Sequence, residues 1–507
     1  MQSKPLDRAL QGASISALRF WHLIGCLLQE APTKGLKTMP RNTDIPQEHG
    51  HHELRAHLAE LYWRTITRPI PPDQILGYYF RKQENIAQKA RGFLAAALYD
   101  LLRERYRLHA LMSNRTPYDS WNGCMPLPAV RAEDETIAAL SFWLWRQYGA
   151  SESEQYVLFS NLIPLWRELT LDDSEEGRRF PNPNQIDPLI FVAIPTVFRP
   201  TALAVWKSGL PLDLADRWRA RFGEEEFEAL VKEFSRPAPL DLRINTLKIT
   251  REKALEVFAE HEIQATKTAL SADGIRLDQK KNIFRMQAFE EGCFEVQDAG
   301  SQLVGFACNA KPTWRVLDAC SGAGGKSLHL SALMKNRGEI FAHDSEADRL
   351  QTQKKRLKRS GSQNVRLIDP GTAPEHGPYD LVLIDAPCLG FGTLRRNPDF
   401  LWRGMLNERL QEIAAMQAGC LNDYAPLVKP GGILVYVTCS FEPEETSALL
   451  EKHQFIQQNF TPDALAPNFK YFNIHLHDLE KESHSLTLLP NRHHTDGFFI
   501  ARYKRKG

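Results

Sequence analysis

The stretch Val316–Leu330, with the sequence VLDACSGAGGKSLHL, joins an apolar run to a helix-like run through a glycine-rich turn. Turns of this kind hold nucleotides or related ligands, and the spacing of their residues distinguishes the classes. A phosphate-binding P-loop needs a glycine five residues before Gly325, and Cys320 occupies that position. A dinucleotide-binding turn needs its third glycine where Ser327 stands. The spacing therefore disfavours both classes.

What remains is a strand that ends at Asp318, a tight turn and the first turn of a helix. The backbone N–H groups at a helix N-terminus favour an anionic group. This arrangement suits a small ligand that carries a carboxylate and a ribose, and S-adenosylmethionine is such a ligand. We therefore expect S-adenosylmethionine as the cofactor. The residues of the predicted turn are Cys320, Ser321, Gly322, Ala323, Gly324, Gly325 and Lys326.

The chain around this turn repeats the alternation of strand and helix. After Pro312, five apolar strands alternate with helical segments, and a late strand follows near the C-terminus. Continuous Val, Ile and Leu runs between helices are typical of a parallel, doubly wound sheet. The predicted fold class is α/β, with a Rossmann-like domain over 311–507. The predicted strands are RVLDAC, EIFAHD, NVRLID, DLVLIDAPC, GILVYVTCS and GFFIARY.

Two regions of different character precede this domain. Residues 213–310 contain short strands and a helix over 250–260, and predict a small α+β subdomain. Residues 51–212 predict an all-α domain, because apolar residues such as Leu54, Leu58 and Leu61 recur at helical spacing. The part from 112 to 212 is less regular but is also expected to be mostly helical.

Residues 1–50 are expected to form a poorly ordered extension. An apolar run over 13–28 faintly resembles part of a signal peptide, but Arg19 and His22 interrupt it. The run is also too short to span a bilayer. An over-long start upstream of Met39 is one explanation of this segment.

Composition limits the compartment and the partners. The formal net charge is +1, so any contact with nucleic acid must come from local basic patches. The 8 cysteines are scattered without paired spacing, which argues against a zinc site and against a disulfide framework. We therefore expect a cytoplasmic monomer with no metal centre and no membrane segment. The basic run KKRLKR, Lys354–Arg359, is either an RNA-binding patch or a solvated helix face.

Acidic residues follow the predicted strands at one edge of the sheet, where ligands of doubly wound folds bind. These residues are Asp318, Asp344, Asp369 and Asp385. Asp344 lies about 20 residues past the glycine turn, where an acidic side chain accepts the ribose hydroxyl protons. Asp369 is expected at the adenine edge. One such aspartate would be read as a helix cap, but four in succession favour a ligand site.

Two cysteines leave neighbouring strand ends beside this site, Cys388 after Pro387 and Cys439 before Ser440. A methyl donor beside two thiols favours methylation of carbon-5 of cytosine, which is a poor nucleophile until a thiolate adds to carbon-6. Asp385, three residues before Cys388, is expected to interact with ring nitrogen 3 during that addition. The target base must be unpaired or flipped out. DNA cytosine-5 enzymes carry Pro-Cys-Gln and Glu-Asn-Val motifs, and this chain has neither.

At these residues the chain resembles the RNA cytosine-5 methyltransferases of the Fmu/Nop2/Sun type. The resemblance implies that Cys439 is the nucleophile and that Cys388 assists release of the methylated product. It implies that residues 320–326 with Asp344, Asp369 and Asp385 bind S-adenosylmethionine, and that Arg395 and Arg396 hold RNA phosphates. The matching motifs are LRINTLK, FEVQDAGSQL, DACSGAGGKS, DAPCLGFGTLRRNPD, KPGGILVYVTCSFEPEE and TDGFFIARY.

The N-terminal half resembles, more weakly, the NusB-like helical domain of the bacterial 16S ribosomal RNA methyltransferases. This similarity is carried by FLAAALYDLLRERYRL and DLADRWRARFGEEEFEAL. It implies an RNA-binding accessory domain and ribosomal RNA as the substrate. Transfer RNA as the substrate, and a non-catalytic RNA-binding role in ribosome assembly, remain alternatives.

Overall fold

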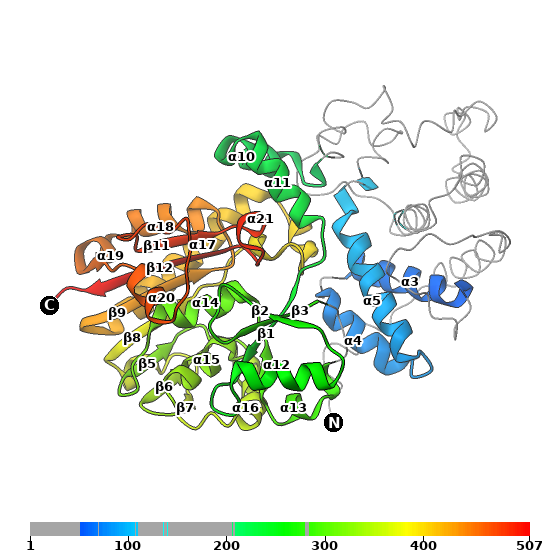
Figure 1. Cartoon of the computed structure of the whole chain (residues 1–507). Helices are drawn as coiled ribbons and strands as arrows, with labels where there is room; N and C mark the ends of the chain where they lie inside the picture. The colour runs from blue at the N-terminus through cyan, green and yellow to red at the C-terminus, as the bar shows by residue number, and fades with distance from the viewer. Residues whose placement is uncertain are drawn as a thin grey trace. The chain divides into compact units, whose positions relative to one another are not determined.

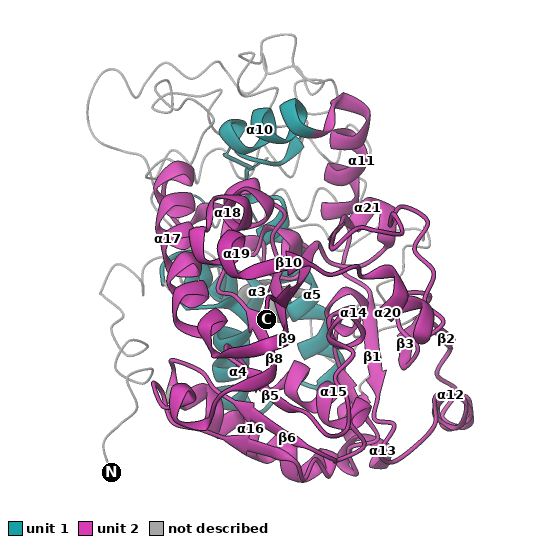
Figure 2. Cartoon of the chain, turned by 90° about the vertical axis from the view of Figure 1, so that its left-hand side faces the viewer, with its two compact units in different colours: residues 1–221 teal, residues 222–507 magenta. Residues whose placement is uncertain are grey.

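The structure is a computed structural model that describes residues 51–68, 70–106, 108–109, 135, 139, 205, 208–278 and 283–507. The predicted extension 1–50 and most of the stretch 112–212 lie outside the described residues. The chain forms two compact units, residues 1–221 and 222–507 (Figures 1 and 2).

The described part of the first unit is helical, as predicted. Leu58 and Leu61 in α3 are fully buried, and so are Leu94 and Leu98 in α5. Pro72 begins α4, a position where its missing N–H costs nothing. The helices are α3 (His51–Ile66), α4 (Pro72–Lys82), α5 (Gln88–Arg103) and α10 (Leu212–Phe222). Similarity of this unit to NusB stays a prediction.

The second unit begins with a helix and a small antiparallel sheet of order β2-β3-β1-β4. The N–H of Lys253 donates to the Thr250 hydroxyl at 3.2 Å, which caps α12 where the sequence predicts its start. Leu242, Phe258 and Phe294 form part of the core of this subdomain. Its elements are α11 (Glu224–Phe234), β1 (Leu240–Ile244), α12 (Arg251–Glu260), β2 (Ala265–Lys267), β3 (Gly274–Leu277), α13 (Gln287–Glu290) and β4 (Phe294–Val296).

The large sheet has eight strands, with β10-β12-β9-β8-β5-β6-β7 in order and β11 paired with β12. Strands β9, β8, β5, β6 and β7 run parallel, and β12 lies antiparallel to β9. This confirms the predicted doubly wound, mostly parallel sheet. The predicted strands are β5 (Arg315–Asp318), β6 (Glu339–Ala342), β7 (Val365–Leu367), β8 (Tyr379–Asp385), β9 (Val428–Thr438) and β12 (Phe498–Arg505). Two further strands of this sheet were not predicted, β10 (Phe460–Pro462) and β11 (Ser485–Leu488).

Helices cover both faces of the large sheet (Figure 1), which explains the continuous apolar strands. Val316 belongs to the same buried core as Phe306 of α14, whereas its neighbour Leu317 belongs to the core on the other face of the sheet, with Leu421 of α17. The helices of this domain are α14 (Ala299–Cys308), α15 (Gly325–Leu333), α16 (Ala347–Ser360), α17 (Leu406–Tyr424), α18 (Ser447–Lys452), α19 (Gln454–Asn459), α20 (Ala466–Tyr471) and α21 (Pro490–His493).

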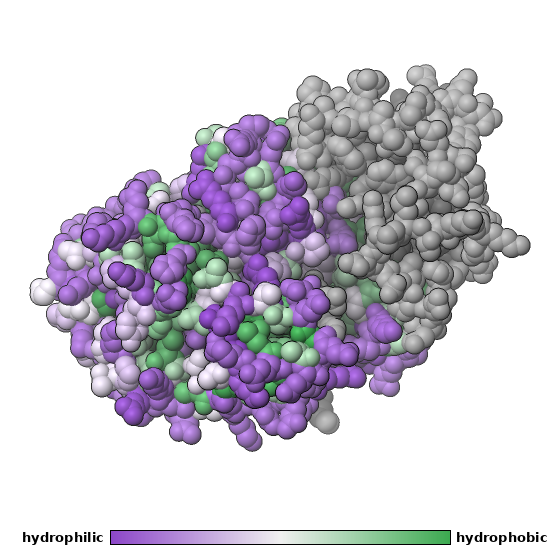
Figure 3. All heavy atoms as spheres, in the orientation of Figure 1, coloured by the Kyte–Doolittle hydropathy of each residue, from purple (hydrophilic) through white to green (hydrophobic). Residues whose placement is uncertain are grey.

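The exterior of the described residues is mostly hydrophilic in the view of Figure 3, with smaller apolar areas between the charged ones. Within the described ranges, none of the helices has the length and apolar character needed to cross a bilayer.

The small subdomain is fastened to the large sheet by side chains of α16. The buried carboxylate of Glu295 in β4 pairs with Arg356 at 2.9 Å and with Arg359 at 2.5 Å. The exposed residues of the basic run are its lysines, Lys354, Lys355 and Lys358. Arg356 and Arg359, two of the six residues in this run, therefore stabilise the contact between β4 and α16. An RNA-binding role of the three lysines stays a prediction.

Candidate active site

The glycine turn lies between β5 and α15 and depends on the left-handed backbone of Gly324. Its φ is +83°, and a Cβ there would lie 2.5 Å from the side chain of Gln353, which is fully buried. The N–H of Gly324 donates to the oxygen of Ser321 at 2.8 Å and closes the turn. Gly322 also has a positive φ, +53°, but faces open space. The side of the turn next to Gly322 is thus free for a ligand.

Two arginines from outside the turn hold its backbone. Arg243 of β1 is buried and donates to the oxygen of Gly325 at 2.5 Å. Arg356 of α16 donates to the oxygen of Ala323 at 2.8 Å. Neither contact is predictable from the sequence, because no local spacing connects an arginine of the small sheet or of α16 with this turn.

The first two strand-end carboxylates meet the turn. Asp318 is fully buried, and its Oδ2 accepts a hydrogen bond from the hydroxyl of Ser327 at 2.6 Å. Burial raises the pKa of Asp318 to about 7, helped by the nearby charge of Asp385 and opposed by the Ser327 hydroxyl. Its Oδ1 has no hydrogen-bond partner within the part of the chain that the structure describes. A buried acceptor without a partner is the kind of group that a polar ligand satisfies.

Asp344 follows β6, and two backbone N–H groups hold its carboxylate in place. Its Oδ2 accepts the N–H of Gly322 at 2.9 Å, and its Oδ1 accepts the N–H of Glu346 at 2.9 Å. Asp344 is therefore fixed beside the open side of the turn. Asp369 is exposed two residues after β7, and its contact with an adenine edge stays a prediction.

Lys326, in the first turn of α15, forms an ion pair with Asp385 at the end of β8, with 2.5 Å between Nζ and Oδ2. Burial opposes the charge of the lysine, but Asp385, Asp318 and Cys439 outweigh that effect, and the pKa of Lys326 lies above its ordinary value. Lys326 was predicted as part of the ligand turn. The structure adds that it reaches the neighbouring strand end and carries positive charge there.

The two predicted cysteines face each other. Cys388 lies three residues after the end of β8, and Cys439 directly follows β9, the parallel neighbour of β8. Their sulfur atoms are 3.1 Å apart. The hydrogen bond with Cys439 and burial raise the pKa of Cys388 well above its ordinary value. The third cysteine of the site, Cys320, is half-buried, and a hydrogen bond with Cys420 raises the pKa of its thiol.

Residues 306–504 match the family model described as 16S rRNA methyltransferase RsmB/F, and residues 210–284 match the ferredoxin-like domain of the same proteins. The chain belongs to the RsmB/F methyltransferase family. This confirms the family that the sequence motifs indicate. S-adenosylmethionine is the cofactor of the RsmB/F family, as predicted from the glycine turn.

Curated relatives match a little over half of the chain. A probable ribosomal RNA small subunit methyltransferase B of Synechocystis sp. is 36% identical over 298 residues, which are 58% of this chain and 66% of the relative. The Bacillus subtilis relative of the same description is 33% identical over 301 residues, with the same two shares. The chain thus matches just under two thirds of the length of these relatives.

Solved structures agree with the fold. The crystal structure of PH0851 has a TM-score of 0.68 at 23% identity and covers 91% of this chain and 100% of its own. A methyltransferase homolog protein from Pyrococcus horikoshii has a TM-score of 0.50 at 29% identity and covers 60% of this chain and 98% of its own. The RsmB/F chain therefore has a Rossmann-like methyltransferase fold.

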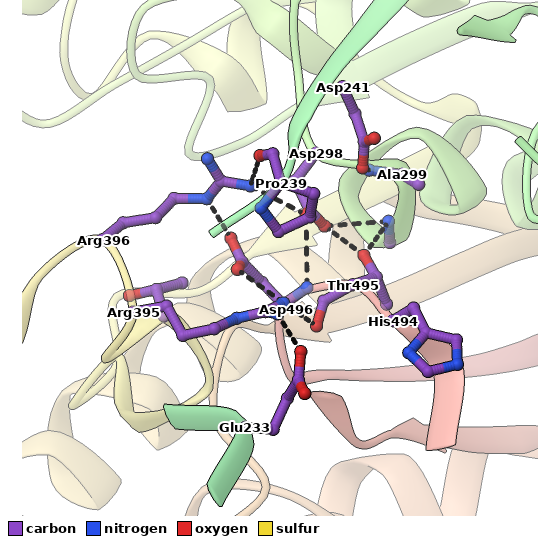
Figure 4. A network of polar contacts seen from close by, with 12 residues as sticks. Glu233, Pro239, Asp241, Asp298, Ala299, Arg395, Arg396, His494, Thr495 and Asp496 are labelled. Atoms are coloured by element: carbon purple, nitrogen blue, oxygen red, sulfur yellow. Dashed lines mark hydrogen bonds and ion pairs between the residues drawn. The ribbon is translucent and has the colours of Figure 1, made fainter. Parts of the chain in front are cut away.

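Arg395 and Arg396 of this RsmB/F chain do not have the role that the sequence suggested. Arg395 is buried and donates to Glu233 of α11 at 2.8 Å. Arg396 donates to Asp496 at 2.5 Å and pairs with Asp298 at 3.1 Å, and Figure 4 shows both guanidinium groups directed at these carboxylates. The prediction that this pair holds RNA phosphates is wrong, because acidic residues from three other segments already neutralise it.

Among the described residues, we find no cluster of three or more His, Cys, Asp or Glu side chains arranged to hold a metal ion. The polar groups of the RsmB/F site are instead a carboxylate–ammonium pair and two thiols. Such a set is suited to acid–base and nucleophilic steps.

Proposed function

We propose that this chain transfers the methyl group of S-adenosylmethionine to carbon-5 of a cytosine in ribosomal RNA of the small subunit, through a covalent adduct with Cys439. The observation that carries the proposal is the 3.1 Å separation of the Cys388 and Cys439 sulfur atoms beside the Lys326–Asp385 ion pair. The names of the curated relatives support the ribosomal substrate.

The residues around the glycine turn fit S-adenosylmethionine. The unpartnered Oδ1 of Asp318 supplies a buried acceptor, and Asp344 stands beside the open space at Gly322. In the proposed arrangement the turn faces the amino acid end, Asp344 the ribose and Asp369 the adenine. When bound, the cofactor supplies an electrophilic methyl group.

In the proposed reaction, the Cys439 thiolate forms a bond to carbon-6 of the cytosine, and the electron pair displaced makes carbon-5 nucleophilic. The Lys326–Asp385 pair interacts with ring nitrogen 3 and stabilises the charge that collects there. Carbon-5 takes the methyl group, and the sulfonium of the donor is left as a neutral thioether. Carbon-5 then gives its proton to water, the electron pair of that C–H bond restores the ring double bond, and the carbon-6–sulfur bond breaks to release the Cys439 thiolate. Cys388, whose raised pKa keeps it as a thiol, assists this last step at the same face of the base.

The remaining parts of the proposal concern RNA selection. We assign binding of RNA to the N-terminal helical domain, 51–212, and expect a monomer that acts in the cytoplasm. Residues 213–310 and 311–507 are the proposed small subdomain and catalytic domain.

Bisulfite sequencing of total RNA from cells with and without the gene tests the function directly. Loss of one methylated cytosine in small-subunit ribosomal RNA, restored by the intact gene and not by the Cys439→Ala variant, is the expected result. Loss of a methylated cytosine in transfer RNA instead would show that transfer RNA, and not ribosomal RNA, is the substrate. RNA binding by the purified protein without methyl transfer to any RNA, and with no change in the cellular pattern, would favour a non-catalytic role.

A further inference from the structure

The turns that follow the two thiols share one buried carboxylate, that of Glu445. Its Oε1 accepts the backbone N–H of Leu389 at 2.7 Å, and its Oε2 accepts the hydroxyl of Ser440. Leu389 is the residue after Cys388, and Ser440 is the residue after Cys439. Glu445 thus touches the chain immediately beyond each sulfur atom.

The carboxylate is itself held in place from two sides. Gln417 of α17 donates to Oε1 of Glu445 at 3.3 Å and to the oxygen of Pro387 at 2.8 Å. The hydroxyl of Tyr436 in β9 donates to the backbone oxygen of Glu445 at 2.9 Å. Glu445 is fully buried, so solvent does not compete for these bonds.

The two thiols also have different charged neighbours, Glu445 near Cys388 and Lys326 near Cys439. Burial raises the pKa of Glu445 to about 7, and its bonds with Ser440 and Leu389 oppose that rise. The carboxylate adds to the rise in the pKa of Cys388 that the bond with Cys439 and burial begin. Cys439, by contrast, interacts with the positive charge of Lys326. The two sulfur atoms therefore have neighbours of opposite charge.

We propose that Glu445 is a positioning residue that ties the turn after Cys388 to the turn after Cys439 and so holds the two sulfur atoms at reacting distance. The proposal rests on the proposed function for the roles of the two thiols. A buried carboxylate that only stabilised its own turn would affect folding, whereas a positioning residue sets the distance between the sulfur atoms in the folded protein.

Three variants of the full chain separate these possibilities. Glu445→Ala removes both acceptors. Glu445→Gln keeps an acceptor for the Leu389 N–H and offers an N–H to the Ser440 oxygen, so it retains the link without the charge. Glu451→Ala removes an exposed carboxylate from the neighbouring helix α18 and is the matched control.

The first measurement is the rate at which diamide joins Cys388 and Cys439 in a disulfide, followed by mass spectrometry of the linked peptides. Two thiols lose two hydrogen atoms to the diazene, so the rate reports on their proximity and needs neither RNA nor cofactor. Glu445→Ala is expected to slow this reaction at least about tenfold, while Glu445→Gln and Glu451→Ala stay within about threefold of the unchanged chain.

The second measurement is methyl transfer. Glu445→Ala is expected to lower kcat by about 10- to 100-fold, with the Kd for S-adenosylmethionine changed less than about twofold, and Glu445→Gln is expected to restore most of kcat. Unchanged cross-linking in Glu445→Ala would overturn the proposal, as would a Glu445→Gln variant as slow as Glu445→Ala. If Glu445→Ala does not fold, Ser440→Ala decides, since it removes one arm of the link and must slow the cross-linking. Because the cross-linking needs no substrate, it remains decisive if no methyl transfer is found.

Discussion

Arg243 in β1 donates a hydrogen bond to the backbone oxygen of Gly325, 2.5 Å away, and so joins the small antiparallel sheet to the ligand turn. The same guanidinium group donates to the side chain of Gln297, next to the start of α14. The small subdomain therefore supports the glycine turn, which is the proposed wall of the cofactor site.

Replacing Arg243 with methionine tests this support. The change leaves the oxygen of Gly325 and the side chain of Gln297 without their donor, and we expect a loss of about 1–3 kcal/mol in the free energy of unfolding. We also expect the Kd for S-adenosylhomocysteine, measured by calorimetry, to rise about tenfold, which corresponds to about 1.4 kcal/mol. Arg236→Ala, at a side chain that is 60% exposed, is the control and should change stability by less than about 0.5 kcal/mol. Equal affinities in Arg243→Met and the control would contradict the assigned support.

Gly324 and Gly322 form a matched pair within the turn. Gly324→Ala combines a positive φ with a contact to the buried Gln353, so we expect a loss of about 2–3 kcal/mol in stability and weak cofactor binding. Gly322→Ala has the strain of positive φ without a clash, and a loss of about 1 kcal/mol is expected. Chemical denaturation of both variants measures the difference, and equal losses would show that Gln353 moves aside.

The buried carboxyl of Asp318 predicts how stability changes with pH. Its pKa of about 7 lies above the value of an unfolded aspartate, so between about pH 4 and pH 7 the folded chain holds a proton that the unfolded chain has lost. The contribution of this group to stability is therefore fully present below about pH 4 and declines as the pH rises through about 7. Asp318→Asn cannot ionise, and the decrease in the free energy of unfolding between pH 5.5 and pH 8 should be smaller than in the unchanged chain by about 1–2 kcal/mol. An identical pH dependence in both proteins would refute this assignment.

In the proposed reaction, replacing Cys439 and replacing Cys388 are expected to block different steps. Without Cys439 no bond to carbon-6 forms, so Cys439→Ala should give no RNA–protein adduct and at least about 1,000-fold slower methyl transfer. Without Cys388 the adduct forms but is released slowly, so Cys388→Ala should accumulate a complex that survives denaturing electrophoresis. Cys293→Ala, at a half-buried cysteine of the small subdomain, is the control and should behave like the unchanged chain. An adduct in Cys439→Ala and none in Cys388→Ala would reverse the two roles.

The strands, the turn and the two cysteines were predictable because each depends on a local sequence pattern. Apolar runs of strand length, glycines where the backbone turns left-handed, and side chains at the ends of parallel strands all follow from residues close together in the chain. The structure confirms the strands and brings Cys388 and Cys439 to 3.1 Å, although 51 residues separate them, because β8 and β9 are parallel neighbours.

What the sequence could not supply is the partner of each buried charge. Arg243 reaches Gly325 across 82 residues, and Leu389 reaches Glu445 across 56. Arg395 and Arg396 looked available for phosphates, yet their neighbours in space are carboxylates of α11, the start of α14 and the segment before β12. A charged side chain that is buried must find a counter-charge, and only the tertiary structure decides which one lies within reach. The sequence by itself therefore determined the family, the sheet and the two cysteines at neighbouring strand ends, because these depend on local periodicity and spacing. The tertiary structure alone decided which residues hold those groups in place, because such contacts join segments that are distant in the chain.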